Sequence, residues 1–107
     1  MCHRVLTVSA LRERLRSKEP PVILDVREAE ELSIVRLEEA VHLPLSQFSS
    51  SVGMLDRNAE FAVLCHHGIR SAHAAEIMVR LGFANVWNVE GGIDAWARDV
   101  DPSMPRY

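Results

Sequence analysis

The sequence predicts an α/β fold built on a parallel sheet. Residues 22–24 and 62–64 form short, continuously apolar runs, which is typical of parallel strands that are buried on both faces. Further strand-like runs at residues 41–43 and 86–89 alternate with segments of helical pattern. Strands that alternate with helices at this spacing indicate a parallel α/β sheet.

The helices follow from their capping residues and apolar spacing. Ser9 is the expected N-cap of a first helix, and the prolines at residues 20–21 end it and force an extended entry into the first strand. A longer helix is expected over residues 71–81, with Gly82 as its left-handed C-cap. Shorter helical stretches are expected at residues 28–32 and 45–55, and residues 101–107 are expected to run extended along the surface.

Length and charge favour one compact domain over residues 1–107. The 107 residues include 48% hydrophobic ones, enough for one modest core. A formal charge of −3 with dispersed basic residues argues against nucleic acid as a partner. No stretch has the length of a membrane span or the apolar region of a leader, so a cytoplasmic protein without membrane contact is expected. The two cysteines, Cys2 and Cys65, fit a reducing compartment better than a disulfide.

The segment from Cys65 to Ser71 carries the strongest chemical signal. Cys65 follows an apolar run and precedes a helix, so backbone N–H groups and the positive end of that helix can surround an anion there. A thiol becomes a thiolate in such surroundings, which makes Cys65 the candidate nucleophile rather than a buried core thiol. The candidate substrate-binding loop comprises His66, His67, Gly68, Ile69, Arg70 and Ser71.

The length of this loop restricts the anion that it can hold. Four residues separate Cys65 from Arg70, whereas protein tyrosine phosphatases have five residues between the corresponding cysteine and arginine. A loop that is one residue shorter suits a small anion better than a tetrahedral phosphate. Gly68 supplies the backbone freedom that inward-facing amides require.

Four segments in a fixed order resemble the rhodanese homology domain. They are Leu24-Asp25-Val26-Arg27-Glu28, Val41-His42-Leu43-Pro44-Leu45, Cys65-His66-His67-Gly68-Ile69-Arg70-Ser71 and Glu90-Gly91-Gly92-Ile93-Asp94-Ala95-Trp96. The resemblance implies a five-stranded parallel sheet with helices on both faces. It also implies a sulfurtransferase that carries sulfane sulfur as a persulfide on Cys65, without a cofactor. Residues 35–40 depart from the family pattern, because they lack its two glycines and its histidine.

Other polar residues are assigned supporting roles. Asp25 is expected to orient Arg70, and Arg27 to pair with an acidic residue such as Glu28 or Glu38. His66 and His67 either line the mouth of the site or lie on the solvated surface. A metal site is not expected, because Cys65, His66, His67 and His73 lack a recognised zinc spacing, and inward-facing amides suit anions.

The resemblance leads to a two-step transfer with several alternatives open. Small sulfur donors, thiosulfate or persulfides, would load Cys65, and a thiol or a protein cysteine would unload it. One alternative is a persulfide carrier or binding module that a protein partner loads. A second is a phosphatase or arsenate reductase of the longer-loop type, against which the loop length argues.

Overall fold

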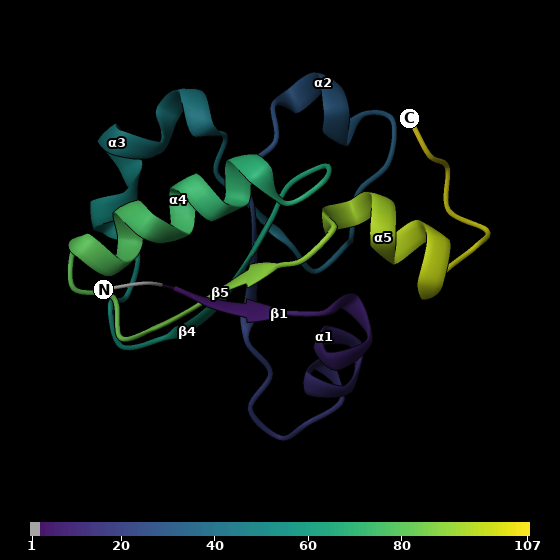
Figure 1. Cartoon of the computed structure of the whole chain (residues 1–107). Helices are drawn as coiled ribbons and strands as arrows, with labels where there is room; N and C mark the ends of the chain where they lie inside the picture. The colour runs from purple at the N-terminus through teal and green to yellow at the C-terminus, as the bar shows by residue number, and fades with distance from the viewer. Residues whose placement is uncertain (1–2) are drawn as a thin grey trace.

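The computed structural model describes residues 3–107 and contains the expected five-stranded parallel sheet (Figure 1). The strand order is β1-β5-β4-β2-β3. The strands are β1 (Arg4–Leu6), β2 (Val22–Asp25), β3 (Val41–His42), β4 (Glu60–Leu64) and β5 (Asn85–Val89). Strand β1 was not predicted, because it is a three-residue edge strand with one buried side chain, Leu6, and therefore has no apolar run.

Helices cover both faces of the sheet (Figure 1). They are α1 (Val8–Leu15), α2 (Ala29–Leu32), α3 (Phe48–Ser51), α4 (Ile69–Arg80) and α5 (Gly92–Asp99), with 3-10 turns at η1 (Leu45–Gln47) and η2 (Val52–Met54). Two hydrophobic clusters result, one on each face. Along β4, Phe61 and Val63 join the cluster beneath α3 and α4, whereas Ala62 and Leu64 join the cluster beneath α1 and α5. This alternation is the reason for the continuously apolar run.

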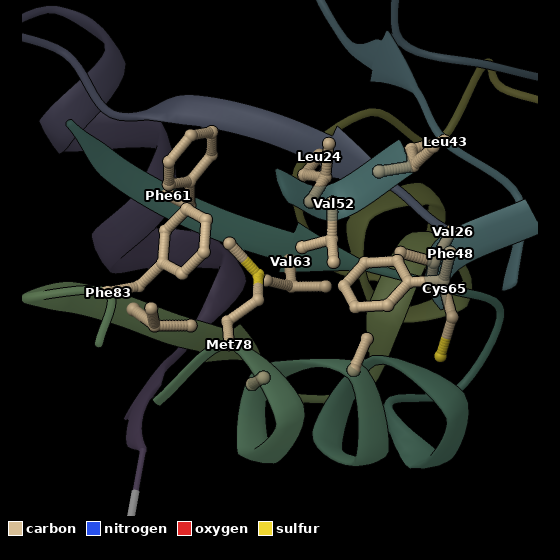
Figure 2. Close-up of a cluster of buried hydrophobic side chains, with 13 residues drawn as sticks. Leu24, Val26, Leu43, Phe48, Val52, Phe61, Val63, Cys65, Met78 and Phe83 are labelled. Carbon is tan, nitrogen blue, oxygen red and sulfur yellow. The ribbon is translucent and has the colours of Figure 1, made fainter. Parts of the chain in front are cut away.

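The cluster beneath α4 holds that helix close to the sheet. Ala74, Ala75 and Met78 on α4 are fully buried, and Met78 projects toward Val63 in Figure 2. Cys65 belongs to the same cluster and lies at one end of the labelled side chains, at the carboxyl edge of the sheet (Figure 2). Small alanine side chains allow the helix to approach β4 and β5 closely.

Several predicted boundaries were wrong. The N-cap of α1 is Thr7, whose Oγ1 accepts a hydrogen bond from the N–H of Ala10 at 3.1 Å, rather than Ser9. Helix α4 begins at Ile69, two residues before the predicted start, and Gly82 follows it with φ +95° as predicted. Residues 45–55 form two 3-10 turns and one short helix instead of a single helix. Residues 101–107 were expected to run extended along the surface, but they turn at Asp101 and contact α5 and α2.

Candidate active site

Cys65 directly follows β4 and lies at the N-terminal end of α4. The residue is 1% exposed, and its Sγ accepts a hydrogen bond from the N–H of Gly68 at 3.0 Å. Among the hydrogen bonds of residues 3–107, this is the one backbone N–H that donates to the sulfur. Gly68 has φ +102°, and a Cβ there would lie 3.2 Å from the backbone nitrogen of Gly91. The glycine therefore meets both a conformational and a steric requirement.

Helix α5 holds the other side of the Cys65 loop. The N–H of Ile93 donates to the carbonyl of Cys65 at 2.8 Å, and the N–H of Asp94 donates to the carbonyl of His66 at 3.0 Å. The positive end of α5 thus binds these two carbonyls. A Cβ on Gly92 would lie 2.4 Å from both carbonyl oxygens, so only glycine allows this approach. This contact between α5 and the Cys65 loop was not predicted from the sequence.

Ser71 and Asn88 form a polar pair behind the sulfur. Ser71 Oγ lies 3.2 Å from Cys65 Sγ and donates to Asn88 Oδ1 at 2.5 Å. Asn88 Nδ2 donates to the carbonyl of Gly68 at 3.1 Å, which fixes the amide of Asn88. Ser71 was predicted in the loop, but Asn88 was missed because it lies inside the apolar run of β5.

Arg70 pairs with Glu31, not with Asp25 as predicted. Its Nη1 and Nη2 atoms donate to the two carboxylate oxygens of Glu31 at 2.6 and 2.7 Å. These hydrogen bonds hold the pKa of Glu31 at about 2 and raise the pKa of Arg70. The predicted role of Asp25 in orienting Arg70 was therefore wrong. A thiolate at Cys65 would further favour the charged form of Arg70.

Asp25 instead pairs with Arg27, and both side chains are 0% exposed. Arg27 Nη2 lies 2.8 Å from Asp25 Oδ2 and also donates to the carbonyl of Val35 at 2.9 Å. Hence the expected pairing of Arg27 with Glu28 or Glu38 was wrong. Residues 35–40, which depart from the family pattern, supply this carbonyl. The side chains of Val35 and Leu37 in this segment are buried in the cluster beneath α1 and α5.

The two histidines of the loop form one stack with Tyr107. The rings of His66 and His67 are 3.8 Å apart, and the ring of Tyr107 lies on His66 at 3.8 Å with an interplanar angle of 8°. Burial lowers the pKa of His66. His67 is exposed, and Ile69 is 80% exposed, so its side chain points away from the sulfur.

Three side chains near the loop carry atoms that could bind a metal cation. Ligand atoms of His66, His67 and Asp94 lie within 4.8 Å of one another. However, Arg106 donates to the two carboxylate oxygens of Asp94 at 3.0 and 3.2 Å. The guanidinium of Arg106 therefore already balances the charge of this carboxylate.

A family model for the rhodanese-like domain matches residues 7–99. The chain belongs to the rhodanese-like family. The Cys65 loop, residues 65–71, lies within the matched range.

Rhodanese-like relatives include proteins of the same size. The putative sulfurtransferase YtwF of Bacillus subtilis is 32% identical, with 91% of this chain and 93% of that protein covered. A rhodanese-related protein from Thermoplasma volcanium has a solved structure with a TM-score of 0.84 and 34% identity, covering 92% and 94% of the two chains. The family and the name of YtwF support a sulfurtransferase activity.

Other relatives are longer. The putative sulfur carrier protein YrkF of Bacillus subtilis is 36% identical over 85% of this chain, but the match spans 49% of that protein.

None of the helices within residues 3–107 has the length and the apolar character that a membrane span requires.

Proposed function

We propose that this rhodanese-like chain transfers sulfane sulfur through a persulfide on Cys65. The observation that carries the proposal is the surroundings of Sγ, which accepts the N–H of Gly68 at the start of α4 while α5 binds the carbonyls of the loop. Both helices thus direct N–H dipoles toward this loop, and such an arrangement stabilises negative charge. A terminal persulfide anion is a small ligand that fits this description.

The reaction divides into two displacements. In the first, the Cys65 thiolate attacks the outer sulfur of thiosulfate, a new S–S bond forms, and the old S–S bond breaks with its electron pair leaving on sulfite. With a small persulfide as donor, a thiolate leaves instead. In the second, a thiolate or cyanide attacks the terminal sulfur, and the electron pair returns to Cys65. Atoms and charge balance without an oxidant or a cofactor.

A persulfide carrier is the second candidate, and one observation favours it. Arg70, the loop cation, is bound by both oxygens of Glu31, so its charge is largely neutralised for a free anionic donor. A site of this kind suits a donor that is positioned by a protein partner. YrkF, which is named as a putative sulfur carrier protein, supports the same candidate.

Intact-mass analysis tests the proposal. The chain is mixed in turn with thiosulfate, cysteine persulfide and glutathione persulfide, and we expect the mass of one added sulfur atom that cyanide removes. Cys65→Ser should not gain this mass and should keep its fold, whereas Cys2→Ser, at a position outside the described residues, should load normally. Loading of Cys2 in place of Cys65 would disprove the mechanism.

Turnover separates the two candidates. An enzyme should form thiocyanate over many cycles with free donor and cyanide, whereas a carrier should load slowly and discharge once. Hydrolysis of an aryl phosphate tests the phosphatase alternative. A Cys65-dependent rate comparable to sulfur transfer would replace our proposal, and we expect none, because four residues separate Cys65 from Arg70.

A further inference from the structure

The segment after α5 folds back onto the Cys65 loop. The N–H of Asp101 donates to the carbonyl of Trp96 at 2.9 Å, and the N–H of Met104 donates to the carbonyl of Asp101 at 3.0 Å, which turns the chain. Arg106 then pairs with Asp94 on α5. In Figure 1 this segment rises from the end of α5 toward α2, and it brings Tyr107 beside His66.

Tyr107 links three segments that surround the loop. Its ring stacks on His66, its hydroxyl donates to Glu31 Oε2 at 2.8 Å, and the hydroxyl oxygen accepts from Arg27 Nη1 at 3.0 Å. Burial raises the pKa of Tyr107, so the hydroxyl keeps its proton and remains a donor to the carboxylate. We refer to the side chains of His66, Arg70 and Tyr107 together as the rim.

Tyr107 acts on both rim groups that could attract an anion. It holds the carboxylate of Glu31 that neutralises Arg70, because the same Oε2 atom accepts from Arg70 and from Tyr107. It also covers one face of His66, and burial lowers the pKa of that imidazole, which favours its neutral form. The rim therefore offers a dianion little positive charge.

We propose that Tyr107 is a specificity-determining residue for the sulfur donor. It selects small, weakly charged sulfane donors over dianionic and bulky ones, by keeping Glu31 on Arg70 and by covering His66. The inference rests on the proposed function, since it concerns which donor loads Cys65. The hydroxyl controls the charge of the rim, and the ring controls its width.

Three donors separate charge from size. Thiosulfate is a small dianion, methanethiosulfonate is a monoanion of similar size, and benzenethiosulfonate is a bulky monoanion. Each gives its outer sulfur to the Cys65 thiolate, and the S–S bond breaks with its electron pair leaving on sulfite or sulfinate. Rates of persulfide formation are compared as kcat/KM ratios between donors, so that a general loss of folded protein cancels.

Two variants divide the contributions of Tyr107. Tyr107→Phe keeps the ring and removes the hydroxyl, so we expect the ratio of thiosulfate to methanethiosulfonate to rise about two- to fivefold, the effect of one partly exposed charge. The ratio of benzenethiosulfonate to methanethiosulfonate should stay constant. Tyr107→Ala should raise both ratios, because it removes the ring as well as the hydroxyl.

The matched control is Arg98→Ala, which removes an exposed ion pair with Asp99 on α5 and should leave all ratios unchanged. Unchanged ratios in Tyr107→Phe and Tyr107→Ala would overturn the inference. Failure of every donor to load Cys65 in the unmodified chain would instead overturn the proposed function. Because Tyr107→Phe retains the stacked ring, it keeps the test valid if Tyr107→Ala does not fold.

Discussion

Asn88 fixes the direction in which the hydroxyl of Ser71 donates. Its Oδ1 accepts that hydroxyl at 2.5 Å, while its Nδ2 is held by the carbonyl of Gly68 at 3.1 Å. A hydroxyl has one hydrogen, so Ser71 presents a lone pair to Cys65 Sγ as long as it donates to Asn88. In this arrangement the Ser71 hydroxyl oxygen can accept a hydrogen bond from the S–H group of Cys65. A thiolate requires the hydroxyl to rotate and donate to sulfur, so the pair responds to the ionisation of Cys65.

Ser71→Ala should slow the reaction of Cys65 with an electrophile, because no hydroxyl can then rotate to donate to the sulfur anion. A hydrogen bond to a charged group contributes about 1.5–3 kcal/mol, which corresponds to a rate about ten- to a hundredfold lower. The rate of alkylation by iodoacetamide at fixed pH measures this directly. Ser50→Ala is the control, because it removes an exposed hydroxyl that bonds to the carbonyl of Gln47. An unchanged rate for Ser71→Ala would mean that the hydroxyl does not stabilise the sulfur anion.

Gly92→Ala should distort the Cys65 loop. The new methyl group would lie 2.4 Å from the carbonyl oxygens of Cys65 and His66, and φ at this position is +61°, so the loop must move. We expect loss of sulfur loading and a decrease in the free energy of unfolding of about 1–3 kcal/mol. Gly53→Ala is a matched control, because its added methyl group meets no atom within 4 Å. Normal loading by Gly92→Ala would show that α5 does not shape the loop.

Glu31 should stabilise the fold mainly above acid pH. Its pKa in the folded chain is about 2, below the ordinary value of 4.5, so the ionised carboxylate is favoured by folding. This stability is present above about pH 4.5 and is lost as the pH falls toward 2. Urea unfolding should show Glu31→Gln less stable at pH 7, with the difference shrinking between pH 4.5 and 2. A difference that persists unchanged at pH 2 would assign the effect to packing instead of charge.

Removing Arg27 alone should be costly. Both members of the ion pair with Asp25 are fully buried, so Arg27→Met leaves an uncompensated carboxylate and should lower the free energy of unfolding by about 3–5 kcal/mol. Replacing both residues, Asp25→Leu with Arg27→Met, should recover much of this loss, because no buried charge remains. Chemical denaturation of the unmodified chain and of the two variants measures both changes. A double variant as unstable as Arg27→Met would mean that the lost hydrogen bond to the carbonyl of Val35 dominates.

The sheet and the position of Cys65 could be predicted because they depend on local pattern. Continuous apolar runs mark β2 and β4, and a cysteine between such a run and a helix must lie at the carboxyl edge of the sheet. Asp25 and Leu64 are register partners, which brings Asp25 to the same edge as Cys65. These relationships follow from chain order and strand direction alone.

The ion pairs could not be predicted equally well, because they depend on side-chain direction across segments. Arg70 reaches Glu31 from a different element, and no spacing in the sequence relates the two residues. The pairing of Asp25 with Arg27 did have a signal, since residues two apart on an extended chain point to one side. The contact of Tyr107 with His66 depends on the turn at Asp101, which an Asp-Pro-Ser sequence suggests without giving its direction.

Because α5 donates hydrogen bonds to the Cys65 loop, the exchange of its first amides measures how often the loop opens. The N–H groups of Ile93 and Asp94 are protected by the carbonyls of Cys65 and His66, so their exchange with solvent deuterium requires those contacts to open. Because 27 residues of chain lie between Cys65 and Ile93, this region is expected to order only after β5 has joined the sheet, since distant contacts carry a larger closure entropy. A refolding chain would then acquire its sheet before its reactive cysteine.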